Sequence, residues 1–261
     1  MSRVVVLTIA VLLAGCSSVP REFHPEAPIA PEAFSHGEFD AVLRQWVDDG
    51  IVQYPAIRRD GRFDLYLSQL NRVDPRALPT RHAQLAYWIN AYNAFAIKGI
   101  VDGLSPSTAW GRYRFFIGAA YEVGGERITL FDLEQRLLIP EYREPRIHFA
   151  IVCASQSCPK LRAEAYAPDR VDAQLEEQAR QFVNDPSKNR FDRDRKVAHL
   201  SMIFQWFEED FAAARGSLLA YVRHYVTDAA LAKELEEQAY RVEFLDYDWS
   251  LNGVPPSGPE R

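Results

Sequence analysis

The sequence predicts an α+β fold, a helix-rich single domain around a small, mainly antiparallel sheet. Apolar residues recur at helical spacing in many segments, whereas runs rich in β-branched and aromatic residues are few and short. The two kinds of segment do not alternate regularly, which argues against a parallel sheet built from βαβ units. Apolar residues make up 48% of the chain and aromatic residues 12%, which is ample for a packed core.

In chain order, the first helix carries apolar residues at positions 39, 42, 43, 46 and 47 and stops at Gly50. Apolar periodicity predicts the remaining helices at residues 65–70, 81–101, 131–138, 171–182, 202–213, 216–226 and 228–238. Gly124 and Gly125 lie between two β-rich runs and predict a hairpin. Strands are expected at residues 115–123, 127–130, 146–153, 197–200 and 240–246.

The N-terminus has the pattern of an export signal. Arg3 precedes an apolar run from Val4 to Leu13 that is too short to span a bilayer stably, and small residues then lead to Cys16. This pattern predicts a lipoprotein signal peptide over residues 1–15, with cleavage before Cys16 and acylation of that cysteine, for example with palmitate. An ordinary signal peptide with an incidental cysteine is the alternative. Ser17 favours the outer membrane of a Gram-negative envelope, with the domain facing the periplasm.

The rest of the chain divides by composition. Residues 16–35 are proline-rich and predict an extended tether, residues 36–252 predict the folded domain, and residues 253–261 predict a disordered tail. The expected partner is therefore the membrane, reached through the N-terminal lipid anchor. A formal net charge of −6 on a well-mixed surface argues against nucleic acid as a partner.

A histidine and two cysteines fall within one short segment, at His148, Cys153 and Cys158. Thiol and imidazole are the usual pair for nucleophilic or redox chemistry near neutral pH. In a strand over residues 146–153, His148 and Cys153 face opposite sides of the sheet, so Cys153 is expected to be inert or bonded. Cys158 precedes Pro159, which favours a short helix over residues 159–165 with the thiol at its activated N-terminus.

Three interpretations of these cysteines stay open. A Cys153–Cys158 disulfide that closes the turn is the usual expectation in an oxidising compartment. Alternatively, the helix 159–165 brings Cys158 to His148 in a thiol hydrolase or transferase. The third interpretation is redox or metal use. A zinc site would need a fourth ligand that the sequence does not supply, so no metal and no cofactor is expected.

The long apolar helix over residues 81–101 carries two amides and a tyrosine, at Tyr87, Asn90 and Asn93. The two amides are three residues apart and share one helix face. Because buried amides must find partners, they either hold backbone groups of a loop or serve the site. In the second case they orient His148 and Cys158 or, together with Tyr87, bind a substrate.

Three charged residues complete the candidate site. Glu134 lies on a helix and Arg146 begins the segment of His148, so an Arg146–Glu134 pair could support the site, although separate surface pairs explain them as well. Asp210 could be the carboxylate that orients an imidazole, with a solvated helix face as the alternative.

Five runs of the sequence resemble the domain-of-unknown-function family DUF547, in the order of the family and over about residues 36–252. They are residues 47–54, Tyr87 to Asn93, His148 to Pro159, residues 203–211 and Tyr247 to Asn252. The resemblance implies a single domain that occurs in many exported bacterial proteins and in plant proteins, and it implies no settled activity. Plant relatives that resemble cytosolic proteins carry the same two cysteines, which weakens a purely structural disulfide.

Two functions follow from these patterns. The first is an uncharacterised envelope lipoprotein that acts as a cysteine-dependent hydrolase or acyl or amide transferase. Cys158 is then the nucleophile, His148 the base, and a helix-start N–H, with Asn93, stabilises the oxyanion. The alternative is a non-catalytic periplasmic module that binds a peptide, a glycan or a protein through an aromatic groove, with both cysteines structural.

Overall fold

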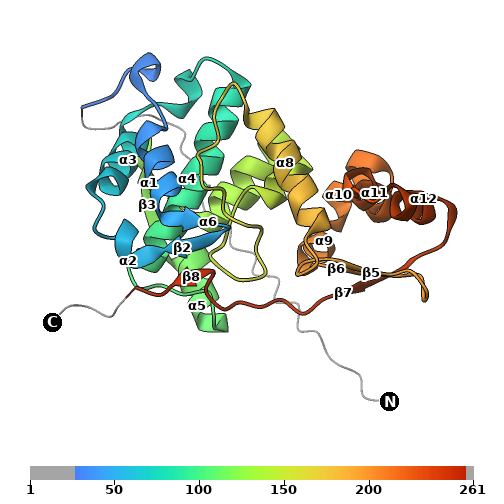
Figure 1. The fold of residues 1–261 in the computed structure, drawn as a ribbon. Helices are drawn as coiled ribbons and strands as arrows, with labels where there is room; N and C mark the ends of the chain where they lie inside the picture. The colour runs from blue at the N-terminus through green and yellow to red at the C-terminus, as the bar shows by residue number, and fades with distance from the viewer. Residues whose placement is uncertain (1–26, 257–261) are drawn as a thin grey trace, which may run out of the picture.

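The longest helix, α4 (Arg81–Val101), organises the N-terminal part of the molecule. Thr80 caps the helix by accepting the Ala83 N–H at 3.0 Å. Nearly all of its residues are buried, because α2 (Tyr54–Ile57), α3 (Gly61–Arg72), η4 (Leu133–Leu138) and α8 (Val171–Asn184) pack against it (Figure 1). The computed structural model describes residues 27–256, and the predicted signal peptide with the acylation site Cys16 lies outside them.

The described chain is helix-rich, and the predicted α+β class is confirmed. Its α-helices, in addition to α4, are α1 (Gly37–Trp46), α2 (Tyr54–Ile57), α3 (Gly61–Arg72), α5 (Ala109–Tyr113), α6 (Leu130–Asp132), α7 (Ile139–Tyr142), α8 (Val171–Asn184), α9 (Met202–Trp206), α10 (Glu208–Arg215), α11 (Leu218–Tyr225) and α12 (Ala229–Glu237). Two π-helices, η3 (Arg114–Gly118) and η4 (Leu133–Leu138), and three 3-10 helices, η1 (Pro31–Ala33), η2 (Pro75–Ala77) and η5 (Pro145–Phe149), complete the helical elements.

The strands form three small sheets in place of the single sheet that the sequence predicts. β1 (Val47–Asp48) pairs antiparallel with β2 (Ile51–Gln53), which pairs parallel with β8 (Gly253–Val254). The predicted hairpin consists of β3 (Ala120–Val123) and β4 (Glu126–Thr129), joined by Gly124 and Gly125 at positive φ. The third sheet contains β5 (Arg190–Asp192), β6 (Val197–Leu200) and β7 (Arg241–Phe244), with β6 and β7 parallel.

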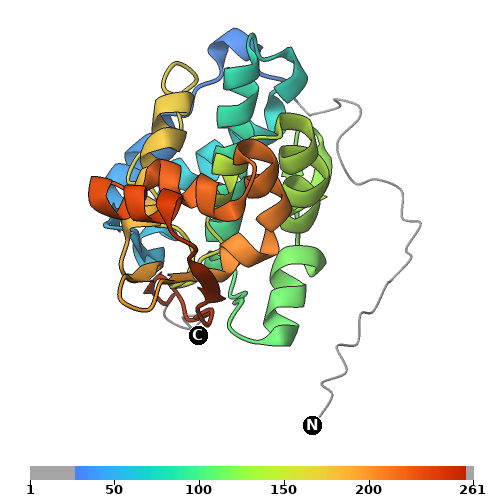
Figure 2. The ribbon, with the colours of Figure 1, turned by 90° about the vertical axis from the view of Figure 1, so that its right-hand side faces the viewer.

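The buried apolar residues form two clusters. The first, called here the α4 cluster, comprises buried residues from Phe39 to Leu175, and the second, the C-terminal cluster, comprises Phe149 and buried residues from Ala179 to Tyr240. Helix α8 contributes to both, because its first half packs in the α4 cluster and its second half in the C-terminal cluster. Figure 2 shows the helices of the C-terminal cluster, in orange and red, facing the viewer.

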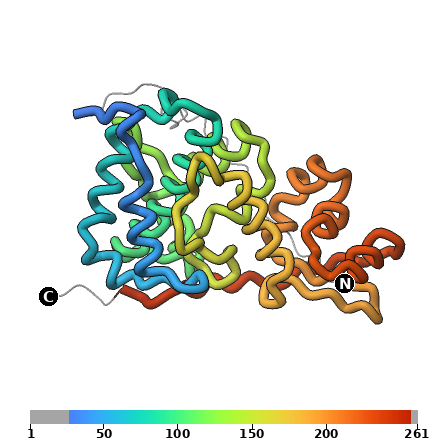
Figure 3. Tube along the Cα trace, turned by 45° about the horizontal axis from the view of Figure 1, so that its top comes forward, coloured from blue at the N-terminus to red at the C-terminus, as the bar shows by residue number. Residues whose placement is uncertain are grey.

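The end of the described chain returns across the molecule. From β7 in the C-terminal cluster it runs along the base to β8, beside the α4 cluster (Figures 1 and 3). Residues 245–252 of this path are called here the return segment. The predicted tail therefore begins too early, because Gly253 and Val254 pair with β2; residues 257–261 lie outside the description.

Two local predictions near the cysteines are wrong. The expected strand over residues 146–153 is the 3-10 helix η5 followed by irregular chain, and residues 159–165 form no helix. Cys158 is therefore not at a helix N-terminus. The predicted tether is also shorter than expected, because Ile29 donates its N–H to the Arg72 carbonyl and Phe34 packs on the α4 cluster. No helix within residues 27–256 has both the length and the apolar character needed to cross a bilayer.

Candidate functional site

The segment that follows η5 is an irregular loop held by side-chain amides. Asn90 and Asn93 on α4 and Gln174 and Gln178 on α8 are all buried. The name amide clamp is used below for these four residues. Asn93 donates to the Ala150 carbonyl at 2.9 Å and accepts the Val152 N–H at 2.8 Å. The clamp thus supplies the backbone bonds that a neighbouring strand would otherwise provide.

The other members of the clamp act in the same way. Asn90 exchanges two bonds with the backbone of Tyr166, at 2.8 and 2.9 Å. Gln174 accepts the Ala167 N–H at 2.8 Å, and Gln178 donates to two loop carbonyls at 3.0 and 3.1 Å. The two asparagines therefore make the backbone bonds of the first interpretation, and neither lines the pocket described below. Neither glutamine was among the residues predicted from the sequence.

A disulfide joins Cys153 to Cys158 in this loop. The return segment holds the loop in place: the N–H groups of Gln156 and Ser157 donate to the carbonyls of Ser250 and Asp248, at 2.7 and 3.1 Å. The Asn252 N–H donates back to the Ala154 carbonyl at 3.1 Å. Tyr247 of the return segment places its hydroxyl 3.2 Å from the Cys158 sulfur.

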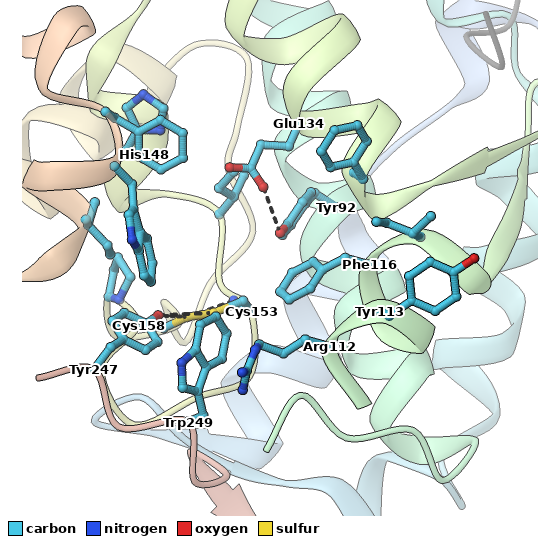
Figure 4. A pocket seen from close by; sticks show the side chains of 17 residues that line it. Tyr92, Arg112, Tyr113, Phe116, Glu134, His148, Cys153, Cys158, Tyr247 and Trp249 are labelled. Atoms are coloured by element: carbon cyan, nitrogen blue, oxygen red, sulfur yellow. Dashed lines mark hydrogen bonds between the residues drawn. A yellow bond between two sulfur atoms is a disulfide. The ribbon is translucent and has the colours of Figure 1, made fainter. Parts of the chain in front are cut away.

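The disulfide lines a pocket of about 340 Å³ between the two apolar clusters. One wall comes from α4, α5, η3 and η4, and the other from η5, the cysteine loop, α9 and the return segment, as Figure 4 shows. The lining is mostly aromatic and aliphatic, with few polar groups: Tyr92, Arg112, Tyr113, Phe116, Ile117, Phe131, Glu134, His148, Ile151, Cys153, Cys158, Pro159, Ile203, Trp206, Phe207, Tyr247 and Trp249.

Aromatic side chains gather at the base of the pocket. Trp206, Tyr247 and Trp249 lie with ring centroids 4.5 to 5.9 Å apart. The Arg112 guanidinium carbon lies 4.7 Å from the centre of the Trp249 ring, and the two side chains are adjacent in Figure 4. Within residues 27–256 the Arg112 guanidinium has no carboxylate partner, and its one hydrogen bond reaches the Pro106 carbonyl at 3.3 Å.

His148 borders the pocket and is 4% exposed. Its ring stacks on Phe207, with centroids 3.8 Å apart, and its Nε2 lies 2.8 Å from an oxygen of Asp210. Asp210 is therefore the carboxylate partner that the sequence analysis considered. The other ring nitrogen, Nδ1, is buried and has no hydrogen-bond partner in the described structure. When Nε2–H donates to Asp210, Nδ1 carries the free lone pair.

Glu134 faces the same pocket from the opposite wall. The Tyr92 hydroxyl donates to its carboxylate at 3.2 Å, as drawn in Figure 4. Burial raises the pKa of Glu134 above its ordinary value, because desolvation disfavours the carboxylate more than the nearby His148 and the Tyr92 bond favour it. A raised carboxyl pKa beside a histidine in a pocket is typical of a functional site.

Both π-helical elements of the described chain contribute to the pocket. η3 supplies Phe116 and Ile117, and η4 supplies Glu134. The wider π turn is uncommon and is found mostly at functional sites, where it changes the direction of a side chain. The sequence predicted a helix at η4, but the strand expected from residue 115 is wrong over η3, and neither prediction includes the π turns that direct these residues to the pocket.

Two predicted site residues lie elsewhere. Tyr87 is fully buried in the α4 cluster and donates to the Leu70 carbonyl at 2.6 Å. Arg146 does not pair with Glu134; it bonds Glu144 at 2.8 Å and Asp172 at 2.7 Å on the surface. The supporting Arg146–Glu134 pair is therefore wrong, and the surface pairs that were the alternative are present.

The predicted catalytic pair shares the pocket but makes no mutual hydrogen bond. The Cys158 sulfur is bonded to Cys153, and the hydrogen bond of His148 goes to Asp210. In this state Cys158 has no thiol to donate a proton to His148, and Asn93 bonds the backbone of Ala150 and Val152 and does not line the pocket. Among residues 27–256, no group of three or more His, Cys, Asp or Glu side chains is arranged to hold a metal ion.

The family model described as "Protein of unknown function, DUF547" matches residues 75–183. The matched residues include α4, η4, His148, both cysteines and most of α8. The wider extent over residues 36–252 stays a prediction. No curated protein and no solved structure matches the chain.

Proposed function

We propose that this protein is a binding module whose aromatic pocket holds a small molecule with an apolar body and an anionic group. The proposal rests on the location of the exposed apolar side chains. Among residues 27–256, half of the large hydrophobic side chains that are exposed line this one pocket: Tyr113, Ile117, Phe131 and Trp206. Concentrated apolar exposure marks a binding site, and a pocket of about 340 Å³ is of small-molecule size.

The polar groups of the pocket favour one chemistry of ligand. Arg112 places its guanidinium over the Trp249 ring at the base of the pocket. In the described part of the chain this guanidinium has no carboxylate partner. An anion on the ligand would complete this group with charge-assisted hydrogen bonds. Glu134 and the Nδ1 atom of His148 are further groups for a hydrogen bond to the ligand.

The test compares two fluorescent probes of similar apolar bulk. 8-Anilinonaphthalene-1-sulfonate carries an anion, and N-phenyl-1-naphthylamine is neutral. Both are expected to bind the wild-type chain. Arg112→Gln should weaken the sulfonate about tenfold, as the loss of a charge-assisted hydrogen bond implies, and leave the neutral probe unchanged.

Arg114→Gln is the matched control, because Arg114 is exposed, lies two residues away and does not line the pocket. It removes the same charge and should change neither affinity. If neither probe binds the wild-type chain, or if Trp206→Ala leaves both affinities unchanged, the pocket is not the binding site.

A second candidate is the cysteine-dependent hydrolase or transferase, with Cys158 as nucleophile and His148 as base. It is supported by the presence of Cys158, His148 and Glu134 on one pocket. It requires that the disulfide be opened first. Thiol counting on the non-reduced protein separates the two functions: two free thiols with rapid alkylation below pH 7 favour the enzyme, and a quantitative disulfide favours the binding module.

We also propose that the protein is an envelope lipoprotein anchored through Cys16 and facing the periplasm. The support is the signal-like pattern of residues 1–16. Radiolabelled palmitate should be incorporated by the wild-type precursor and not by Cys16→Ser. A wild-type protein that stays unlabelled and fractionates with soluble proteins contradicts the anchor.

A further inference from the structure

We infer that the Cys153–Cys158 disulfide is a thiol–disulfide exchange site in which Cys158 is the leaving and returning thiolate. This activity goes beyond ligand binding and does not depend on it. The inference rests on the hydrogen bonds that converge on one of the two sulfurs.

Three donor groups lie around the Cys158 sulfur. The Cys153 N–H lies at 3.0 Å, the Tyr247 hydroxyl at 3.2 Å and the Ser155 hydroxyl at 3.4 Å; the Ser155 hydroxyl also lies 3.1 Å from the Tyr247 oxygen, to which it can donate instead. A disulfide sulfur is only a weak acceptor and does not require this set. A thiolate does, because hydrogen bonds to a charged sulfur are much stronger than those to a neutral one. The surroundings of Cys158 are therefore suited to the reduced, ionised state.

Cys153 differs from Cys158 in both donors and access. Its sulfur is 3.3 Å from the Ser155 hydroxyl and 3.3 Å from the Tyr247 hydroxyl, and no backbone N–H contacts it. Each hydroxyl has a single proton, so a charge on Cys158 would draw both protons to that side. Cys153 is also half-buried, whereas Cys158 is 4% exposed. An external thiol thus reaches Cys153 more easily and expels Cys158.

Backbone hydrogen bonds hold the loop in addition to the disulfide. Backbone bonds to the return segment hold Gln156 and Ser157, and the bond from Asn252 holds Ala154. Ala154 stays at a φ of +62°, in the left-handed region that non-glycine residues rarely adopt. A disulfide whose only role was to close this turn would add to bonds that already hold it. An exchange site, in contrast, needs a loop that keeps its conformation when the disulfide is reduced.

The reaction needs a dithiol reductant, either a small molecule or a protein. One thiolate of the reductant attacks the Cys153 sulfur; the new S–S bond forms, the Cys153–Cys158 bond breaks and its electron pair goes to Cys158. The second thiolate of the reductant then attacks the reductant's own sulfur in the mixed disulfide. Cys153 leaves and takes up a proton, and the reductant departs as a disulfide, having lost two electrons.

The first test uses the full chain under native conditions with dithiothreitol as reductant, followed by alkylation with iodoacetamide and mass spectrometry of the cysteine peptides. The disulfide should open without loss of the folded state, as monitored by circular dichroism. The thiolate absorbance at 240 nm should appear at a lower pH in reduced Cys153→Ser, which keeps Cys158, than in reduced Cys158→Ser, which keeps Cys153. A disulfide that opens only in denaturant, or a thiolate that forms at a lower pH in Cys158→Ser, overturns the inference.

The second test identifies the donor. Tyr247→Phe should lower the alkylation rate of Cys158 at pH 6.5 at least threefold, with a smaller effect at pH 9, where both thiols ionise. Tyr121→Phe is the matched control, because the Tyr121 hydroxyl is buried without a partner and lies outside the pocket. Equal rates for the wild type and Tyr247→Phe at both pH values contradict the role of Tyr247. Probe binding that fails while exchange persists would overturn the binding function alone.

Discussion

The amide clamp and the pocket both contain buried polar groups, but their hydrogen bonds differ. Each asparagine of the clamp bonds a backbone donor and a backbone acceptor of the loop. In the pocket, the Nδ1 atom of His148 has no described partner and burial raises the pKa of Glu134, although Glu134 accepts a bond from Tyr92. The comparison shows that the clamp residues hold the backbone, whereas His148 keeps a free polar atom beside a cavity.

The largest effect is expected from Asn93→Ala. The variant leaves the Ala150 carbonyl and the Val152 N–H buried without a partner, which should lower the free energy of unfolding by about 3 kcal/mol. Urea denaturation measures it. Gln181→Ala on the exposed face of α8 is the control and should change stability little. Equal losses in the two variants would remove the distinction between clamp and surface.

His36 is another polar side chain outside the pocket that has a hydrogen-bond partner. Its effect on the free energy of unfolding should be smaller than that of Asn93. The Tyr66 hydroxyl bonds its Nδ1 at 2.8 Å, and burial lowers the pKa of His36 to about 4. The unfolded chain, with a histidine pKa near 6.5, then binds protons more strongly between these values. The contribution of His36 to the free energy of unfolding is therefore complete above pH 6.5. It falls by about 2 kcal/mol as the pH drops to 4, a figure reduced because the side chain is partly exposed.

Urea denaturation across this pH range should show a weaker decline in His36→Asn than in the wild type. Parallel pH profiles for the two proteins would show that another group controls the acid sensitivity.

Asp210→Ala tests the contribution of His148, which has a hydrogen-bond partner at only one of its two ring nitrogens. Removal of the carboxylate leaves both ring nitrogens of His148 without the partners seen in the structure, which should cost about 1 kcal/mol in the free energy of unfolding. Glu209→Ala, at an exposed neighbouring position, is the control. Identical denaturation midpoints for the two variants would show that the His148–Asp210 bond contributes nothing to the fold.

Glu134→Gln should have the smallest effect, and with the opposite sign. A carboxyl whose pKa is raised on folding lowers stability as the pH rises above its unfolded value, and the loss is complete above its folded value, so the neutral amide should slightly stabilise the protein at pH 7. Below the ordinary value of 4.5 both states are protonated and the gain should vanish. Thermal unfolding at pH 7 and pH 4 checks both statements; a loss at pH 7 contradicts them.

Helical periodicity predicts α4, α8 and the C-terminal helices well, because their apolar stripes face one cluster or the other. The run from Arg146 to Cys153 misleads, because its β-branched residues pack in the core without a partner strand. Side chains of α4 and α8 bond its backbone instead, and nothing in the local sequence reports these distant partners. The available signals were the amides on apolar helix faces: Asn90 and Asn93 on α4, which in one interpretation were predicted to bond a loop, and Gln174 and Gln178 on α8, which were not noticed.

The sequence predicted only some of the site residues, because local sequence does not report which distant residues meet in the fold. His148, Cys158 and Glu134 share a pocket, and Asp210 reaches the imidazole as one interpretation held. Tyr87 and the Arg146–Glu134 pair were wrong, since proximity to a motif in sequence does not determine which residues meet in space. Arg112, Tyr247 and Trp249 lie far from the cysteines in the chain, and only the path of the return segment and the position of α5 bring them to the pocket.

The return segment determines when, during synthesis of the chain, the pocket can be completed. Tyr247 and Trp249 belong to one of the last parts of the described chain to be synthesised, yet they complete a cavity whose other walls come from residues 92–207. During translation those walls can pack before the final strip has emerged from the ribosome. The pocket is therefore complete only once residues 245–252 have joined it, and under the proposed function a chain that terminates before residue 245 should bind neither fluorescent probe.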